Sequence, residues 1–398
     1  MTQPGPDPDP DGAPGFLEPA YGSRSLSEVL PAVATALGSS ALDSPRPDAR
    51  SGGTAPEGGL VLPEAAAYVV FLIDGLGAQQ LRRYAHAAPF LATLLEQHEP
   101  GTAGVPSTTA TSLTSLGTAL APGTHGLVGF TSRIPGTERL LNALMWDKGI
   151  DPTQWQPHPT AFERLAAAGV RTTVINKRDF AGTGLTVAAQ RGGEYLGADR
   201  VGERIAAAVS CSSATASLTY AYEADLDWTG HKFGVSSPQW LQQLAMIDAE
   251  AEQLREALPE RVRLLVVADH GMVDSPPEAR IDVDAAEHLV LREGVTLLGG
   301  EARFRHLYCA GGAVADVAAT WREVLGHRAE VLTRDEAVRR GWFGAAIATV
   351  LPRIGDVVVA CRGDAAVVST TDFAYENTLV GLHGSLSPAE MLIPMIVA

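Results

Sequence analysis

Two apolar runs that each end in an aspartate decide the fold: "AAYVVFLID" at residues 66–74 and "VRLLVVAD" at residues 262–269. Both are rich in β-branched and aromatic residues, a pattern typical of strands buried on both faces of a sheet. Further strands are expected at residues 170–176 and 216–227, and helical patterns separate these runs. The alternation predicts an α/β fold with a doubly wound, mainly parallel central sheet and helices on both faces.

The 398-residue chain is long enough for one large domain, which we expect over residues 59–398. Residues 1–58 are expected to be largely disordered because they are rich in Pro, Asp and Gly. One helix is expected there, in "SLSEVLPAVATALG" at residues 25–38, packed on the body. Residues 279–345 are expected to form a small inserted cap beside the sheet, with a helix in "VADVAATWREVLG".

Composition limits the partners and the compartment. A formal net charge of −16 argues against nucleic acid or an anionic membrane as a partner, and no apolar run reaches 18 residues. The N-terminus lacks the basic and apolar regions of a secretory signal. The three cysteines are few and widely spaced, as expected for reduced thiols. We therefore expect a cytoplasmic protein, and the oligomeric state stays open.

Metal-ligating residue types gather at strand ends and nearby loops. In doubly wound folds, ligands bind beyond the carboxyl ends of the strands. A single aspartate at the end of a strand is more often a turn residue than a metal ligand. Six metal-ligating residues at the same edge of one sheet, however, indicate a metal site. Three aspartates and three histidines suit two sites with mixed N and O ligands, which favours Zn²⁺ and tolerates Mn²⁺. The six candidates are Asp74, Asp227, His231, Asp269, His270 and His383.

The stretch "VPSTTATSLTSLGTALAPGTHGLVGF" at residues 105–130 is unusually rich in Ser and Thr. Eight of the twelve residues from Ser107 to Thr118 are Ser or Thr, yet Leu113 and Leu116 recur at helical spacing. Ser107 or Thr108 is expected to cap a helix that starts directly behind a proline. Most of the other hydroxyls are expected to be caps or small packing residues.

The order of these motifs resembles the alkaline phosphatase superfamily, and within it the type I phosphodiesterase/nucleotide pyrophosphatase branch. The resemblance rests on "FLIDGLG", "DLDWTGHKFG", "VVADHGM" and "LVGLHGSL", and it spans Val69 to Val397. It implies the alkaline phosphatase-like form of the fold. Counting back from His125 in the "TxLxPxxHG" stretch implies that Thr109 is the nucleophile, at a helix start that favours anions.

The resemblance also distributes the metal ligands. It implies that Asp227, His231 and His383 bind one divalent ion. Asp74, Asp269 and His270 would bind the other, together with the oxygen of Thr109. Ser112 stands where eukaryotic nucleotide-cleaving members have an asparagine that contacts phosphate, so Ser112 is expected to donate one hydrogen bond to the substrate.

The function implied is hydrolysis of phosphodiester or pyrophosphate bonds through a covalent phosphothreonine. The partner expected is a small phosphorylated substrate, and a nucleotide stays open because Phe130, Trp146 and Trp228 are only candidates for stacking a base. A metal-dependent phosphomonoesterase or phosphonate hydrolase on the same site is one alternative. A non-catalytic, metal-stabilised binding protein is another.

Substrate selectors are harder to name from sequence. Lys177 and Arg178, in a loop after a strand, are candidates for holding a second phosphate, although a solvated loop charge is the simpler interpretation. Asn142 and Trp146 are candidates for lining the entrance of the site.

Overall fold

The computed structural model describes residues 15–43, 59–214 and 216–398. Its core is a six-stranded sheet with the order β18-β8-β1-β7-β5-β6. Five neighbouring strands run parallel, and β18 pairs antiparallel with β8 at one edge. This confirms the predicted doubly wound, mainly parallel sheet. The strands are β1 (Ala67–Ile73), β5 (Arg171–Asn176), β6 (Glu194–Gly197), β7 (Ser217–Glu223), β8 (Val262–Val267) and β18 (Met395–Val397).

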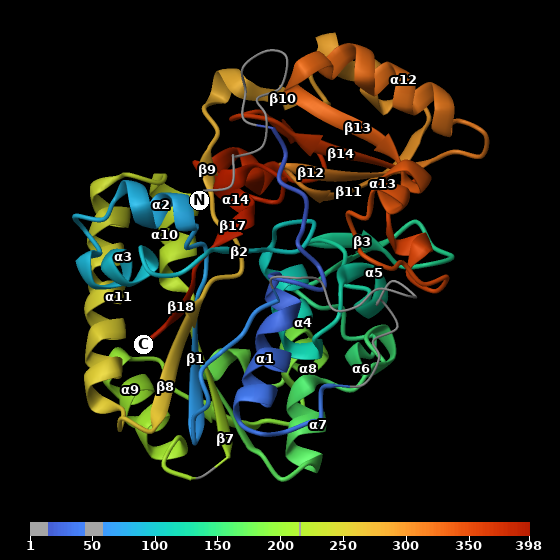
Figure 1. Cartoon of the computed structure of the whole chain (residues 1–398). Helices are drawn as coiled ribbons and strands as arrows, with labels where there is room; N and C mark the ends of the chain where they lie inside the picture. Colours follow the sequence, from blue (N-terminus) through green and yellow to red (C-terminus); the bar gives the residue numbers. More distant parts are fainter. Residues whose placement is uncertain (1–14, 44–58, 215) are drawn as a thin grey trace.

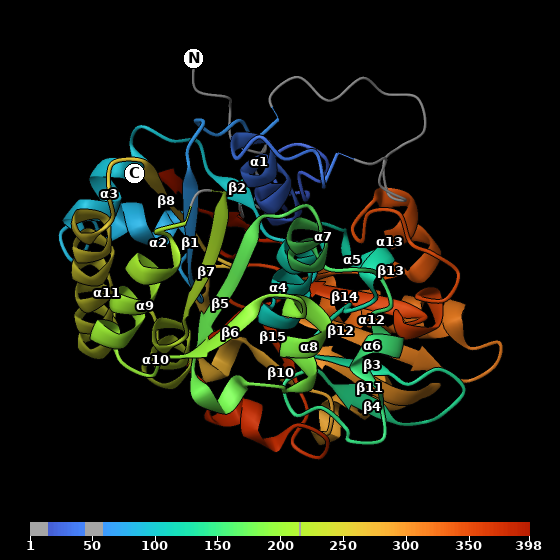
Figure 2. The same cartoon turned by 90° about the horizontal axis from the view of Figure 1, so that it is seen from below.

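Helices cover both faces of this sheet, as predicted (Figures 1 and 2). One layer contains α1 (Val29–Ala36), α4 (Thr109–Thr118), α5 (Pro122–His125), α6 (Pro152–Trp155), α7 (Ala161–Ala167) and α8 (Gly184–Gln190). The other contains α2 (Ala78–Arg83), α3 (Pro89–Leu95), α9 (Val201–Cys211), α10 (Asp225–Phe233) and α11 (Pro238–Ala257). Every residue of β1 and β7 is buried, because these strands lie between the two layers.

Local signals fix where several helices begin. Helix α11 starts behind Ser237, whose hydroxyl accepts a hydrogen bond from the Trp240 N–H at 3.1 Å. Helix α7 begins with a capping box between Thr160 and Glu163. The strand expected over residues 216–227 ends at Glu223, because the chain turns into α10 at Asp225.

The N-terminal part also joins the core. The helix expected at residues 25–38 is present as a 3-10 turn, η1 (Leu26–Glu28), followed by α1. Leu26, Leu30 and Val33 are fully buried in the main core cluster. The disorder expected for residues 1–14 and 44–58 falls outside the described residues.

A second, smaller unit lies over the carboxyl edge of the sheet, drawn in orange in Figure 1. Its four-stranded antiparallel sheet has the order β11-β12-β14-β13 and its own buried cluster around Trp321. This unit, called the cap below, extends past residue 345, because β14 is a central strand of its sheet. Its elements are β11 (Val295–Glu301), β12 (Phe304–Cys309), α12 (Val314–Leu325), β13 (Ala329–Thr333), α13 (Arg334–Arg340) and β14 (Val357–Cys361).

Short strand pairs tie the cap and the loops to the sheet. They are β2 (Gly101–Thr102) with β17 (Leu392–Ile393), β3 (Thr131–Arg133) with β4 (Leu140–Asn142), β9 (Val273–Asp274) with β16 (Gly381–Leu382), and β10 (Arg280–Asp282) with β15 (Ala366–Val368). Helix α14 (Pro388–Met391) precedes β17. The β9–β16 pair joins the two connections between the sheet and the cap.

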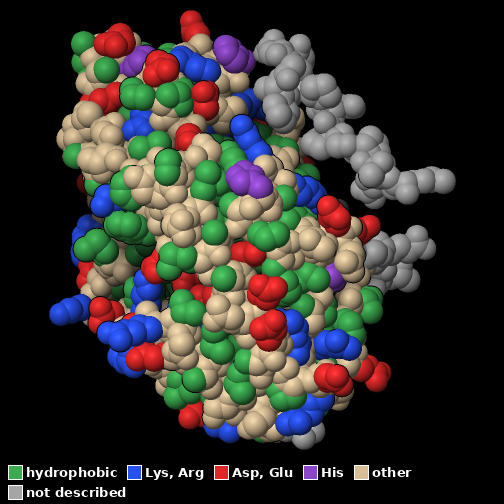
Figure 3. All heavy atoms as spheres, turned by 90° about the vertical axis from the view of Figure 1, so that its left-hand side faces the viewer, with side chains coloured by type: hydrophobic (Ala, Val, Ile, Leu, Met, Phe, Trp, Pro, Cys, Tyr) green, Lys and Arg blue, Asp and Glu red, His purple; other side chains and the backbone are tan. Residues whose placement is uncertain are grey.

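The outer surface is mixed in character. On the face shown in Figure 3, acidic and basic side chains are interspersed with apolar and neutral ones, as is typical of a solvent-facing surface. Within the described ranges, none of the helices has the length and apolarity needed to cross a bilayer.

Candidate active site

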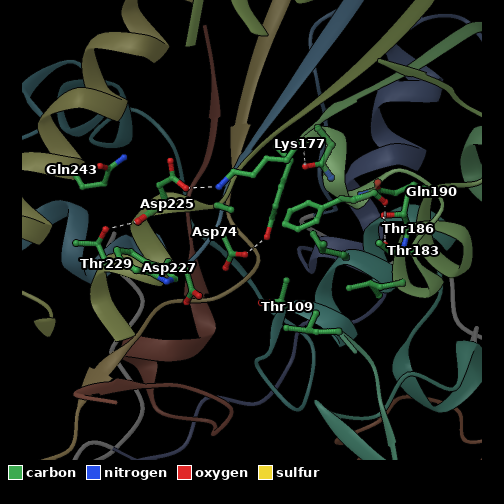
Figure 4. A pocket seen from close by; sticks show the side chains of 18 residues that line it. Asp74, Thr109, Lys177, Thr183, Thr186, Gln190, Asp225, Asp227, Thr229 and Gln243 are labelled. Carbon is green, nitrogen blue, oxygen red and sulfur yellow. Dashed lines mark hydrogen bonds and ion pairs between the residues drawn. The ribbon is translucent and has the colours of Figure 1, made fainter. Parts of the chain in front are cut away.

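The six predicted ligands and Thr109 lie together at the carboxyl edge of the sheet. Asp74 follows β1 directly, and Asp269 and His270 follow the neighbouring strand β8. The other elements come from farther away: α10 carries Asp227 and His231, His383 follows β16, and Thr109 is the first residue of α4. In Figure 4, the side chains of Asp74, Thr109 and Asp227 point toward one shared space.

The first group of ligands consists of Asp74, Asp269 and His270. His270 Nε2 lies 3.5 Å from Asp74 Oδ1 and 3.3 Å from Asp269 Oδ2. Thr109 Oγ1 lies 3.2 Å from the same nitrogen, so the threonine hydroxyl faces this group. The three ligand atoms lie within 4.8 Å of one another and all three residues are buried, which places them within reach of one ion.

The second group consists of Asp227, His231 and His383. Asp227 and His231 lie one helical turn apart on α10, and Asp227 Oδ2 is 3.4 Å from His231 Nε2. His383 Nε2 lies 3.2 Å from His231 Nε2 and 3.8 Å from Asp227 Oδ1. The two groups adjoin, because the rings of His270 and His383 stack with centroids 3.7 Å apart.

Hydrogen bonds at the far side of each ring show which nitrogen is free for a ligand. The Nδ1 atoms of His231, His270 and His383 lie 2.7, 3.0 and 2.9 Å from the carbonyl oxygens of Gly381, Gly271 and Ser107. A carbonyl only accepts, so each Nδ1 carries the hydrogen and each Nε2 presents a lone pair. Three imidazole lone pairs therefore converge, an arrangement that a cation would stabilise.

Unpartnered carboxylate oxygens point to the same conclusion. Asp74 Oδ1, Asp227 Oδ1 and Asp269 Oδ2 are buried and have no hydrogen-bond partner among the described residues. A buried polar atom without a partner is costly and calls for an explanation such as an ion. The donor set of carboxylate oxygens and imidazole nitrogens is the one that Zn²⁺ and Mn²⁺ accept. The residues present therefore fit divalent ions at both groups.

The electrostatics of the protein alone are unfavourable. Burial raises the pKa of Asp74 well above its usual value, and the nearby carboxylates of Asp269 and Asp227 raise it further. Burial lowers the pKa of His383 well below its usual value, and His270 and His231 add to this effect. The raised pKa disfavours the negative charge of Asp74, and the lowered pKa disfavours a positive charge on His383. Bound divalent cations would stabilise the ionised carboxylates.

Supporting residues orient the first group, and sequence reasoning missed one of them. The N–H groups of Gly75 and His270 donate to Asp269 Oδ1 at 3.0 and 2.9 Å. The Tyr222 hydroxyl donates to Asp74 Oδ2, a contact made across 148 residues of sequence. The only available signal was the position of Tyr222 near the end of β7, on a strand beside β1.

Ser112, expected to contact the substrate, makes a hydrogen bond within the protein. Its side chain is fully buried, and its hydroxyl donates to the carbonyl oxygen of Asp269 at 2.8 Å. This hydrogen bond connects α4 to the first ligand group. Thr114 and Thr118 likewise donate to carbonyls one turn earlier in α4, at 2.7 and 2.6 Å.

A cleft of about 680 Å³ opens beside Thr109, between α10 and α8 (Figure 4). Its apolar lining comes from Leu113, Leu144, Phe180, Leu185 and Trp228. Its polar lining includes Asn176, Lys177, Thr183, Thr186, Gln190 and Gln243. The volume lies within the range of about 300–1,000 Å³ that is usual for sites that enclose an organic ligand.

Some of the residues expected to select the substrate line the cleft, and others do not. Lys177 lines the cleft, and its Nζ lies 2.5 Å from Asp225 Oδ1. Arg178 points away to Asp199 and Glu203. Of the aromatic candidates, Trp228 lines the cleft.

The remaining candidates have structural contacts. The Phe130 ring packs against Tyr375, and the Trp146 ring packs against Trp155. The side-chain oxygen of Asn142 accepts hydrogen bonds from the N–H groups of Leu144 and Met145, so it shapes a turn.

Known proteins resemble this chain in sequence and in fold. The sequence model of a family described as type I phosphodiesterase / nucleotide pyrophosphatase matches residues 68–386. Comparison with curated protein sequences found no match.

Solved structures with similar folds include murine ectonucleotide pyrophosphatase / phosphodiesterase 5. Its TM-score is 0.64 at 17% identity, over 83% of this chain and 87% of that one. An inactive threonine-to-alanine variant of the murine protein, in complex with AMP, has a TM-score of 0.64 at 16% identity, over 83% and 87%. Phosphonoacetate hydrolase from Sinorhizobium meliloti 1021, in complex with phosphonoformate, has a TM-score of 0.64 at 19% identity, over 84% and 90%.

Proposed function

Because the chain belongs to the type I phosphodiesterase/nucleotide pyrophosphatase family, we propose that it hydrolyses phosphodiester or pyrophosphate bonds with Thr109 as the nucleophile. The observation that carries the proposal is the position of the Thr109 hydroxyl. It lies at the start of α4 and 3.2 Å from His270 Nε2, beside the first group of convergent ligands.

Two divalent ions fit the site, most readily Zn²⁺ and also Mn²⁺. Asp227, His231 and His383 would hold one of them. Asp74, Asp269 and His270 would hold the other, with the Thr109 oxygen completing that set. Such ions would supply Lewis acidity, which favours the ionised threonine hydroxyl and offsets the negative charge of the transition state.

The chain itself positions the reacting groups. Thr109 Oγ attacks phosphorus, a phosphothreonine forms, and the bond to the leaving oxygen breaks. Water then hydrolyses the phosphothreonine and returns the threonine hydroxyl. The first hydrogen bond of α4 joins the Ser112 N–H to the Thr108 carbonyl at 2.9 Å. The N–H groups of residues 109–111 therefore have no acceptor within the helix. These groups and the positive end of the helix dipole would stabilise the phosphoryl oxygens.

The cleft favours a substrate with a sizeable organic group. A volume of about 680 Å³ with apolar side chains at Leu113, Leu144 and Trp228 exceeds what a two-carbon phosphonate fills. Nucleotides remain one such class. Lys177 favours the second candidate, a phosphonate hydrolase or phosphomonoesterase, because a cation at the cleft could hold an additional anionic group.

The test is hydrolysis by the metal-loaded protein of bis-p-nitrophenyl phosphate, p-nitrophenyl phosphate and phosphonoacetate. We expect the diester to be cleaved fastest, and Thr109→Ala to lose at least about 10³-fold in kcat. Thr111→Val is the matched control in the same helix, because the Thr111 hydroxyl is buried without a partner among the described residues.

The outcomes separate the candidates. Faster cleavage of the monoester or of phosphonoacetate would move the protein to the second candidate. Full activity of Thr109→Ala would refute the mechanism. An absence of turnover with both ions bound would favour a non-catalytic binding protein.

A further inference from the structure

A buried ion pair joins the cap to the chain that follows His383. Arg303, in the turn between β11 and β12, and Glu390, in α14, are both fully buried. The guanidinium and the carboxylate meet in two parallel contacts, with Nε donating to Oε1 at 2.7 Å and Nη2 donating to Oε2 at 2.8 Å. In Figure 1, α14 lies where the cap meets the central sheet. Such a two-contact pair fixes orientation as well as distance.

The Glu390 carboxylate also holds the loop that carries His383. Its Oε1 accepts a hydrogen bond from the Ser385 N–H at 2.9 Å, and its Oε2 accepts one from the Ser387 hydroxyl at 2.5 Å. The Ser385 carbonyl accepts a hydrogen bond from the Ser107 hydroxyl at 2.6 Å. His383 in turn directs its Nδ1 hydrogen to the Ser107 carbonyl at 2.9 Å. The carboxylate therefore fixes this loop at the point where it meets the nucleophile segment.

The main chain of α14 reaches the other ligand group. The Glu390 carbonyl accepts a hydrogen bond from the Gly271 N–H at 2.8 Å, and the Gly271 carbonyl accepts the Nδ1 hydrogen of His270 at 3.0 Å. A Cβ atom added to Gly271 would lie only 2.0 Å from the Ala389 carbonyl oxygen, so α14 packs directly on this backbone. Helix α14 thus contacts the chain beside both stacked histidines, His270 and His383.

Arg303 links α14 to the cap sheet. Its Nη1 donates to the Ala365 carbonyl at 2.5 Å, and its own carbonyl accepts a hydrogen bond from the Cys361 N–H at 2.9 Å. Cys361 is the last residue of β14, and its carbonyl also accepts a hydrogen bond from the Ser385 hydroxyl at 2.6 Å. Removal of the arginine alone would leave Glu390 as a buried carboxylate without a counter-charge, which is strongly unfavourable. The loop that this carboxylate holds would then have to shift.

We propose that Arg303 is a positioning residue for the second ligand group, which acts through Glu390 to hold His383 in place for a divalent ion. The first group depends mainly on the pairing of β1 with β8, which Arg303 does not contact. The two ions are therefore expected to respond unequally to its loss. The inference rests on the two-ion site of the proposed function, and it gives the cap a role in metal binding.

The experiment titrates Zn²⁺ into the chelator-stripped full-length protein by calorimetry. His383→Ala serves as the reference that identifies the heat of binding of the second ion. Arg303→Met should weaken binding of the second ion at least about tenfold, the usual effect of losing an outer contact of a metal ligand, and binding of the first ion by less than about threefold. If both ions are bound as in wild type, or if both are weakened equally, the inference is wrong.

Arg305→Met is the matched control. Arg305 is a second fully buried arginine of the cap; it pairs with Glu376 and donates to the Val367 carbonyl at 2.9 Å. Within the described chain, none of its hydrogen bonds reaches residues 383–390. Its loss should destabilise the cap as well, yet leave both ions bound with wild-type affinity. A loss of the second ion as large as that in Arg303→Met would indicate general damage to the cap and would overturn the inference.

Further outcomes keep this test separate from the proposed function. Wild-type protein that binds two ions but cleaves no ester would refute the hydrolase proposal, while selective loss of the second ion in Arg303→Met would still support the inference. If Arg303→Met does not fold, Arg303→Lys decides, because lysine keeps the charge but cannot form the two parallel contacts. Selective weakening of the second ion in that variant supports the inference, and wild-type affinity for it overturns the inference.

Discussion

The buried Glu301 carboxyl predicts a pH dependence of stability that a single substitution removes. Burial raises the pKa of Glu301 to about 8, against the opposing effects of the nearby Thr108 side chain and of the hydrogen bond that Glu301 Oε2 accepts from the Phe130 N–H. Only 7% of the surface of Glu301 is exposed, so solvent screening reduces the effect little. In the unfolded chain the same group titrates near 4.5.

The sign follows from proton counting. Between pH 4.5 and 8 the folded protein holds a proton on Glu301 that the unfolded chain has lost. The free energy of unfolding therefore falls as pH rises through this window. From pH 5.5 to 7.5 the two pKa values give a loss of about 2.5 kcal/mol for this group. Glutamine resembles the protonated carboxyl but cannot ionise, so Glu301→Gln should escape the loss.

The assay is guanidinium unfolding of chelated wild-type and Glu301→Gln protein at pH 5.5, 6.5 and 7.5. The free energy of unfolding of the variant, minus that of wild type, should increase by about 2.5 kcal/mol across the series. All other titrating groups are common to both proteins and cancel in this difference. Parallel pH curves would show that Glu301 is ionised in the folded state and would refute the reasoning.

Three other predictions concern the core, the ions and the cleft. Arg204 pairs with Glu223 and Glu250 in a fully buried cluster, so Arg204→Ala should lower the free energy of unfolding by about 3–5 kcal/mol in denaturant titrations, and a loss under 1 kcal/mol would contradict this. Zn²⁺ at about 1,000 times its Kd should stabilise the folded protein by about 4 kcal/mol, seen as a higher Tm that chelation reverses; equal Tm values would count against the ligand groups. Trp228→Ala should raise KM for an aryl diester several-fold, because Trp228 lines the cleft that would hold the organic group of the substrate. Inhibition by inorganic phosphate should stay unchanged. A parallel loss of phosphate inhibition would instead place Trp228 in the phosphoryl site.

Much of the sheet domain was predictable because its signals are local. The apolar runs of β1 and β8 predict buried strands whatever else the chain contains. The Ser237-Pro238 start of α11 is likewise a local signal. Pro89 is another such signal, because a proline disfavours a helical residue before it, and it separates α2 from α3.

The extent of the cap was not predictable from local pattern. The strand β14, "VVVAC", is as apolar as β1, and only its antiparallel pairing with β12 and β13 assigns it to the cap sheet. Supporting residues of the site share this difficulty. Tyr222 and Glu301 act across 148 and 171 residues of sequence, and neither stands in a motif of ligand residues. Periodicity describes one segment at a time, so it carries no information on such pairs.

The two ligand groups differ in how firmly the fold holds them. Asp74 and Asp269 follow β1 and β8, neighbouring parallel strands buried at the centre of the sheet, so their spacing is fixed by strand pairing. The second group combines a helix, α10, with His383 on the chain that returns from the cap. Its spacing depends on the β9–β16 pair and on the Ser107–Gly384 bridge. The cap is therefore connected to the candidate site in more than one place: His383 follows β16 on the chain that returns from the cap, and Glu301 at the end of β11 accepts a hydrogen bond from the Phe130 N–H.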